Sequence, residues 1–143
     1  MSGSATKAAK AYFGRRYLLS ASHRLHVDAI TAEENRAAYG KCNNPHGHGH
    51  NYVIEVVVGG PVDPETGMVM NLVDLDRVVH ERVLERFDHR NLNLDPAFES
   101  NVPTTENLSL VLVEILRGAL PKGSLEHVRI EETENNFFEC YDA

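Results

Sequence analysis

The protein contains 143 residues, of which 42% are hydrophobic and 24% charged, as is typical of a single soluble globular domain. Its formal net charge is −7, and this acidic balance argues against sequence-independent binding to nucleic acid. The sequence contains only two cysteines, no secretory signal and no apolar stretch that could span a membrane. We therefore expect a cytoplasmic protein with residues 1–11 as a flexible tail and residues 12–143 as one domain.

Two long strands and a short helix are predicted in the first half of the sequence. Alternating apolar residues predict a strand over residues 12–22 that carries His23 inward at its end. A capping box at residues 31–34 begins a short helix, which Gly40 is well placed to end. A second long strand follows over residues 48–58, and its even-numbered side chains share one face.

Two helices and two more strands are predicted in the second half. An apolar stripe at helical spacing extends over residues 71–87, and a second helix extends from Thr104 to about Gly118. Residues 125–130 and 136–141 are predicted strands. The order ββααββ predicts an α+β domain in which two helices cover one face of a four-stranded antiparallel sheet. The two open edges of such a sheet favour pairing in a homo-oligomer.

Histidine is concentrated near the N-terminus, where five of the eight histidines lie between residues 23 and 50. His48 and His50 are two residues apart on a strand, so both imidazoles project from one face, and His23 ends another strand with matching parity. Three such nitrogens can bind zinc and leave a fourth position for water or substrate, as catalytic zinc sites do. The alternatives are surface or hydrogen-bonded core histidines, and His46 has the parity to replace one ligand.

Four further residues are candidates for chemistry or binding. Cys42 precedes His48 by six residues, and it can be a base activated by a dication, a fourth zinc ligand or an inert buried thiol. Asp88 can orient the imidazole of His89, although exposed Asp-His pairs are common. Glu132 can hold a guanidine-like edge with two hydrogen bonds, or it can belong to a solvated acidic cluster.

Seven motifs follow one another along the sequence from about Tyr12 to Tyr141. They are Leu19-Ser20-Ala21-Ser22-His23, Gly40-Lys41-Cys42-Asn43-Asn44-Pro45, His48-Gly49-His50-Asn51-Tyr52, Gly67-Met68-Val69-Met70-Asn71-Leu72, Phe87-Asp88-His89, Thr104-Thr105-Glu106-Asn107 and Glu132-Thr133-Glu134-Asn135-Asn136. Taken together and in this order, they closely resemble the 6-pyruvoyltetrahydropterin synthase family, whose fold is shared by 6-carboxytetrahydropterin synthase. Leu19 departs from the phenylalanine of animal members, and His46 adds a histidine beside the predicted metal-binding loop.

The resemblance implies the tunnelling fold, in which the sheets of three subunits join into a barrel and two trimers stack into a homohexamer. It also implies a zinc ion bound by the histidines of the family motif, with a cysteine as the catalytic base. In this sequence the matching zinc ligands are His23, His48 and His50, and the matching base is Cys42.

The same resemblance implies residues for proton transfer and for substrate binding. Asp88 and His89 would form a second proton-relay element, contributed across a subunit interface. Glu132 would anchor the amino-pyrimidine edge of the pterin. The same pocket would be lined by Thr104, Thr105 and Glu106.

The implied substrate is 7,8-dihydroneopterin triphosphate, which loses triphosphate and undergoes internal redox tautomerisation to the 6-pyruvoyl pterin, without nicotinamide or flavin. Zinc would acidify a C–H bond next to the oxygens that it binds, and Cys42 would accept the proton. The closest rival is 6-carboxytetrahydropterin synthase of the queuosine pathway. In that group the cysteine stands closer to His-Gly-His in the sequence, whereas here five residues separate Cys42 from His48. The second rival is a non-catalytic zinc-binding protein with Cys42 as fourth ligand.

Overall fold

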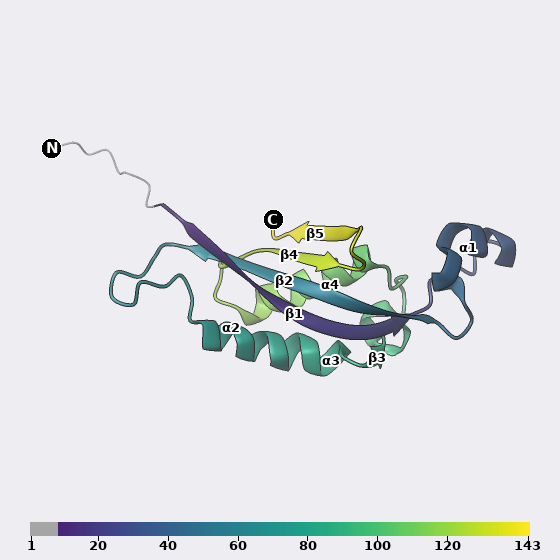
Figure 1. Ribbon diagram of the computed structural model, residues 1–143, viewed down its shortest axis with the longest axis horizontal. Helices are drawn as coiled ribbons and strands as arrows, with labels where there is room; N and C mark the ends of the chain where they lie inside the picture. The colour runs from purple at the N-terminus through teal and green to yellow at the C-terminus, as the bar shows by residue number, and fades with distance from the viewer. Residues whose placement is uncertain (1–8) are drawn as a thin grey trace.

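A twisted five-stranded sheet with helices on one face organises the computed structural model, which describes residues 9–143 (Figure 1). Most of the predicted N-terminal tail, residues 1–8, lies outside the described residues. The strands are β1 (Ala11–His23), β2 (His48–Gly60), β3 (Arg90–Asn91), β4 (Leu125–Glu131) and β5 (Phe137–Tyr141). Their spatial order is β3-β1-β2-β4-β5, so the two longest strands lie side by side near the centre.

The prediction of a four-stranded, purely antiparallel sheet is wrong on both points, because the sheet has five strands and one parallel pair. The four predicted strands are present, but β3 pairs in parallel with β1, opposite Ala21 and Ser22, and makes the sheet mixed. A strand of two exposed residues has no alternation to detect, which is why the sequence pattern missed it. In addition, β1 begins at Ala11, so this residue belongs to the sheet rather than to the predicted tail.

The register between β1 and β2 determines where the functional residues meet. Each strand has 13 residues, and the antiparallel pairing extends without interruption from Ala11 opposite Gly60 to His23 opposite His48. Because side chains alternate between the two faces of a strand, His23, His48 and His50 extend the row of side chains that faces the helices. The predicted inward direction of His23 is confirmed, since its side chain is almost fully buried.

The helix predicted after the capping box is α1 (Ala32–Tyr39), which continues into a 3-10 turn over Gly40–Asn43. Both hydrogen bonds of the capping box form: the Thr31 hydroxyl accepts from the Glu34 N–H, and the Glu34 carboxylate accepts from the Thr31 N–H. Gly40 ends α1 with φ of 54°, a positive value that costs glycine little. This turn carries Cys42 toward the sheet.

The apolar stripe over residues 71–87 forms one helical segment built from three parts, α2 (Leu72–Val79), a π-helical turn (His80–Leu84) and α3 (Glu85–Phe87). The predicted second helix is α4 (Thr105–Ala119), and its N-cap Thr104 accepts a hydrogen bond from the Asn107 N–H. Short 3-10 turns at Leu92–Leu94 and Pro96–Phe98 connect the two helices. Within residues 9–143, no helix is long and apolar enough to cross a membrane.

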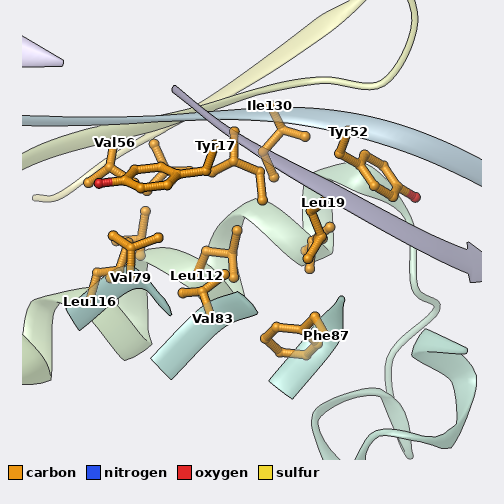
Figure 2. Close-up of a cluster of buried hydrophobic side chains, with 14 of the residues drawn as sticks. Tyr17, Leu19, Tyr52, Val56, Val79, Val83, Phe87, Leu112, Leu116 and Ile130 are labelled. Carbon is orange, nitrogen blue, oxygen red and sulfur yellow. The ribbon is translucent and has the colours of Figure 1, made fainter. Parts of the chain in front are cut away.

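The hydrophobic core lies between the sheet and the helices (Figure 2). Leu19, Val56 and Ile130 of the sheet pack in one cluster with Leu112 and Phe87 of the helices, and all five are fully buried. The other face of the sheet carries ion-paired side chains such as Arg129, and Leu18 there is 73% exposed. The predicted coverage of one face by helices is therefore confirmed.

Candidate metal centre and active site

Four side chains from separate parts of the fold bring their donor atoms to one end of the covered face. His23 ends β1, His50 lies near the start of β2, Cys42 lies in the turn after α1, and Glu132 directly follows β4. One ligand atom from each residue lies within 4.8 Å of the corresponding atoms of the other three. A nitrogen, nitrogen, sulfur and oxygen set this compact can hold a metal ion.

The ring of His23 is oriented by a backbone carbonyl outside the four-donor group. Its Nδ1 lies 2.8 Å from the carbonyl oxygen of Pro103, which can only accept, so Nδ1 carries the proton. The lone pair of Nε2 is therefore free to face the other donors. A ligating histidine whose second nitrogen donates to a carbonyl is a recurrent feature of protein metal sites.

His50 lies at the centre of the group. Its Nε2 is 3.1 Å from His23 Nε2, 3.7 Å from Cys42 Sγ and 3.3 Å from a carboxylate oxygen of Glu132. Burial lowers the pKa of His23 and of His50 below the ordinary histidine value, so both imidazoles are neutral at pH 7. Neutral imidazoles are the form that binds metal ions.

His48, the third predicted ligand, lies beside this group rather than within it. Its ring is edge-on to that of His50, with the ring centroids 4.8 Å apart, and it is only half-buried. His46, which has the same parity, is not among the four donors. The two members of the four-donor group that the predicted ligand set did not include are Cys42 and Glu132.

The Cys42 thiol is held at the centre by the fold of its loop. The Cys42 carbonyl accepts a hydrogen bond of 2.7 Å from the Leu25 N–H, which ties the turn after α1 to the segment that follows β1. Burial raises the pKa of the Cys42 thiol, and the carboxylate of Glu132 raises it further. A thiolate at this position therefore requires a compensating positive charge close by, as a bound metal ion would supply.

Glu132 is positioned by α4. One carboxylate oxygen accepts a hydrogen bond of 2.6 Å from the Thr105 hydroxyl, and the other faces His50 at 3.3 Å. Thr105 is 2% exposed in the first turn of α4, whereas Glu106 beside it is exposed and Thr104 caps the helix. Of the three residues predicted to line the pocket from this helix, Thr105 is the one whose side chain hydrogen-bonds to the four-donor group.

Asp88 and His89 lie on the outer side of β1, next to β3. An Asp88 carboxylate oxygen accepts from the Ser20 N–H at 2.9 Å, and the His89 N–H donates to the Ser20 carbonyl at 2.6 Å. The His89 imidazole is 81% exposed and lies 3.6 Å from the Asp88 carboxylate. A cavity of about 360 Å³ over β1, β2 and β3 is lined by both His50 and His89.

His89 has a backbone conformation that is unusual for a residue with a side chain. Its φ of 57° is the one positive value among the non-glycine residues in the described part of the protein. Such a conformation is energetically unfavourable outside glycine and is often found at functional sites. Here the hydrogen bond from the His89 N–H to β1 holds the backbone in place, and the imidazole is left exposed.

Sequence reasoning missed two groups around the centre, the Pro103 carbonyl and the Tyr52 hydroxyl. Tyr52 is fully buried, and its hydroxyl lies 3.4 Å from His23 Nδ1. Nothing in a single sequence indicates a backbone carbonyl that lies 80 residues from its partner. Tyr52, by contrast, stands in the His-Gly-His-Asn-Tyr motif with the parity of the histidines, and this signal could have identified it.

Comparisons with known proteins confirm the family that the motifs predicted. The model of the family described as "6-pyruvoyl tetrahydropterin synthase" matches residues 13–143. The 6-pyruvoyl tetrahydrobiopterin synthase of Homo sapiens is 48% identical over 128 residues, which cover 89% of this chain and 88% of the human protein. The structure of Caenorhabditis elegans 6-pyruvoyl tetrahydropterin synthase matches with a TM-score of 0.90 and 38% identity, over 97% of this chain and 100% of that chain.

A relative with another activity in its name matches over a shorter region. The putative 6-carboxy-5,6,7,8-tetrahydropterin synthase of Archaeoglobus fulgidus is 39% identical over 93 residues, which cover 64% of this chain and 73% of that protein. The family match, by contrast, extends over nearly all of the described strands and helices. The protein therefore belongs to the 6-pyruvoyl tetrahydropterin synthase family.

Proposed function

We propose that the protein is a zinc-dependent 6-pyruvoyltetrahydropterin synthase, a lyase that eliminates triphosphate from 7,8-dihydroneopterin triphosphate. The observation that carries the proposal is the four-donor group of His23, Cys42, His50 and Glu132, formed in a member of this family. No external oxidant is needed, because oxidation of one carbinol to a ketone is balanced by reduction of the dihydropterin ring to the tetrahydro level. Oxidation of the other carbinol is balanced by conversion of the carbon that loses triphosphate into a methyl group. Two free cysteines are compatible with a reducing cytoplasm.

Imidazole and thiolate donors suit zinc better than calcium or magnesium, which prefer oxygen ligands. We assign His23, His48 and His50 as the ligands, as the family resemblance implies, with the ring of His48 edge-on to that of His50 beside the four-donor group. Cys42 and Glu132 then remain available for the substrate. When bound, zinc supplies Lewis-acid polarisation of the substrate's carbinol oxygens and a local positive charge.

Cys42 is assigned as the base that removes a proton from a carbinol carbon of the substrate. Its sulfur lies 3.7 Å from His50 Nε2, so a substrate held at the centre would be within its reach. Asp88 and His89 are assigned to the return of protons. The exposed imidazole of His89 is accessible to a substrate that another subunit holds.

Glu132 is assigned as the pterin anchor. A carboxylate can accept two parallel hydrogen bonds from the amino-pyrimidine edge, and this geometry is specific for a guanidine-like group. Thr105 keeps one carboxylate oxygen in a defined direction. Thr104 and Glu106, at the start of the same helix, are assigned to the wall of the same pocket.

We infer a homohexamer built from two trimers, in which the sheets of three subunits close into a barrel. The edges of the described sheet support this inference. At one edge of the sheet, the short β3 pairs with β1 only at Ala21 and Ser22, so the rest of this side of β1 is open. At the other edge lies β5, in which Phe137 and Tyr141 are more than half exposed. Pairing between such edges buries open backbone groups and avoids indiscriminate aggregation.

The product formed from 7,8-dihydroneopterin triphosphate tests the proposal. The protein is incubated with this substrate alone, and the bound metal is quantified on the same sample. We expect inorganic triphosphate and the 6-pyruvoyl pterin, with turnover proportional to zinc content. Acetaldehyde together with a carboxylated pterin as main products would instead identify a 6-carboxytetrahydropterin synthase. Zinc bound without turnover would indicate a non-catalytic protein.

A further inference from the structure

The turn that carries Cys42 is attached to the segment that follows His23 by Cys42 itself and by its neighbour Asn43. Figure 1 shows α1 beyond the end of the sheet where β1 ends, so the chain returns from this helix toward the donor group. On its return, the Cys42 carbonyl accepts from the Leu25 N–H at 2.7 Å. The Asn43 side chain donates from Nδ2 to the Leu25 carbonyl, also at 2.7 Å. Both backbone groups of Leu25, two residues after His23, are therefore bound by this turn.

Asn43 is a buried polar residue whose hydrogen bonds all go to one short segment. It is 5% exposed, so water does not replace a hydrogen bond that is lost there. Besides the Leu25 carbonyl, its Nδ2 contacts His26 Nδ1 at 3.0 Å, and its backbone carbonyl accepts from Arg24 Nε at 3.2 Å. Three consecutive residues after His23 are thus bound to this one asparagine.

The partners of the Asn43 amide determine its orientation. The Leu25 carbonyl can only accept, so the amide nitrogen rather than the amide oxygen faces it. The second N–H of the same nitrogen is directed to His26 Nδ1, which therefore accepts. In the neutral ring, His26 Nε2 then carries the proton, and it faces an Asp28 carboxylate oxygen at 3.3 Å. Both donors of the amide are used, and Asn43→Ala or Asn43→Asp removes both of them.

We propose that Asn43 is a positioning residue that holds the Cys42 thiol at the donor group by attaching the turn after α1 to residues 24–26. The Cys42 sulfur lies 3.7 Å from His50 Nε2. His50 is held there by its strand, whereas Cys42 lies in a four-residue turn. Without the Asn43 amide, the turn keeps only the bonds of its two backbone carbonyls to Leu25 and Arg24. The thiol is then expected to spend part of its time away from the donor group.

Asn35 provides a matched control for Asn43. It is also a buried asparagine, and its Nδ2 donates to the Val27 carbonyl at 2.8 Å, in the same loop after β1. Its Oδ1 accepts from the Val27 N–H at 2.7 Å. Asn35→Ala therefore removes a comparable set of hydrogen bonds from this loop, but these bonds do not include the turn that carries Cys42. A general effect of loosening the loop would appear in the Asn35 variant as well.

The first measurement is the rate at which iodoacetamide alkylates each cysteine, determined by mass spectrometry of the digested protein. In Asn43→Ala and Asn43→Asp we expect Cys42 to react severalfold faster than in wild type, because a released thiol is more accessible. Cys140 on β5 is the internal reference and is expected to react at the wild-type rate in every variant. Asn35→Ala is expected to leave both rates unchanged.

The second measurement is steady-state kinetics with 7,8-dihydroneopterin triphosphate, and its interpretation rests on the proposed function, in which Cys42 is the base. We expect kcat to fall about 10²-fold in both Asn43 variants, the cost of a reacting group misplaced by about 1 Å. KM and zinc content should stay near wild type, because the proposed metal ligands and Glu132 lie outside the turn.

A wild-type alkylation rate of Cys42 in both Asn43 variants would overturn the proposal. Equal acceleration at Cys140 or in Asn35→Ala would also overturn it, since the effect would then be a general loosening of the fold or the loop. Faster alkylation with an unchanged kcat would show that the position of the thiol does not limit turnover, again contrary to the proposal. If wild-type protein does not convert the substrate, the proposed function fails, and the alkylation rates still decide whether Asn43 positions Cys42.

Discussion

The two ends of the covered sheet face bury different chemistry. At the end with the proposed centre, buried polar side chains gather, among them His23, Asn43 and Thr105. At the opposite end, the same face of β2 buries Val56 and Val58 in the hydrophobic core. The alternation of the strand is the same at both ends, so the difference comes only from residue type. One end is therefore expected to determine activity and the other the free energy of unfolding.

The larger cavity of the protein does not lie at the end with the proposed centre. A cavity of about 680 Å³ lies at the apolar end, where β2 ends and the turn before α2 begins, and none of the proposed site residues lines it. The smaller cavity of about 360 Å³ is the one that both His50 and His89 line. The convergence of titratable side chains, rather than cavity volume, is the reason for placing the proposed centre at this end of the sheet.

Removal of zinc should have the largest effect at the polar end. We expect chelation to lower turnover on the order of a thousandfold or more, because Lewis-acid stabilisation contributes several kcal/mol to a transition state. It should also weaken binding of the triphosphate substrate, since the protein has a formal net charge of −7 and loses a local dication. Isothermal titration with the metal-free protein measures this second effect. Undiminished affinity would show that other groups hold the triphosphate.

Cys42→Ala should have the next largest effect. We expect kcat to fall by about 10²–10⁴-fold, the usual contribution of general base catalysis, while the zinc content stays constant. Cys140→Ala is the matched control, because this second cysteine lies on β5 away from the donor group and is also partly buried. Steady-state kinetics and metal analysis on the same samples distinguish the roles. Loss of zinc together with activity in Cys42→Ala would identify the thiol as a metal ligand.

Leu116→Ala tests the apolar end. Leu116 is fully buried on α4, and truncation of such a leucine typically costs about 2–5 kcal/mol of unfolding free energy. We expect kcat per folded molecule to remain near wild type, because Leu116 lies about three helical turns after Thr105. Urea denaturation and activity measured in parallel check both parts. A large loss of kcat in the folded fraction would mean that the two ends are coupled.

Local patterns predicted most of the fold because each depends on neighbours in sequence. Strand alternation placed β1 and β2, and capping signals placed the starts of α1 and α4. The two-residue β3 and the π-helical turn have no such period. Asn35 illustrates a further limit: it is fully buried and hydrogen-bonds the Val27 N–H and carbonyl, and no local rule distinguishes it from exposed helix residues.

Sequence motifs indicated the members of the candidate site whose chemistry is evident from neighbouring residues. They did not indicate the members that depend on a tertiary contact. The alternation that predicted His23 and His50 on one face is a property of the strands themselves. The sequence is equally compatible with Glu132 as a substrate anchor and with Glu132 in a solvated acidic cluster. Its hydrogen-bond partner Thr105 lies 27 residues away in the sequence, so no local pattern indicates the contact. The same is true of Tyr52, whose position in the strand predicts burial but not the partner of its hydroxyl.

The smallest effects on the free energy of unfolding are expected at two surface ion pairs near helix ends. Arg86 after the π-helical turn makes two hydrogen bonds to Asp95, of 3.0 and 2.7 Å, whereas Arg117 near the end of α4 makes one of 2.6 Å to Asp142. Exposed pairs contribute about 0–1 kcal/mol, and two-point geometry favours the upper part of that range. We therefore expect Arg86→Met to cost more unfolding free energy than Arg117→Met.

Acid titration tests this last comparison further, because the pKa of Asp95 is shifted in a known direction. The hydrogen bond from Arg86 lowers it below the ordinary aspartate value of 3.8, with a further contribution from the Ala97 N–H. A carboxyl whose pKa is lower in the folded state stabilises the fold above its unfolded pKa, and this contribution disappears as the pH falls through the folded pKa. The stability difference between wild type and Arg86→Met, measured by urea denaturation, should thus be constant from pH 7 to about 5 and shrink below about 4. A difference independent of pH down to about 2 would show that Arg86 stabilises α3 by packing over the Phe87 ring, whose centroid lies 4.8 Å from the guanidinium carbon, rather than through Asp95.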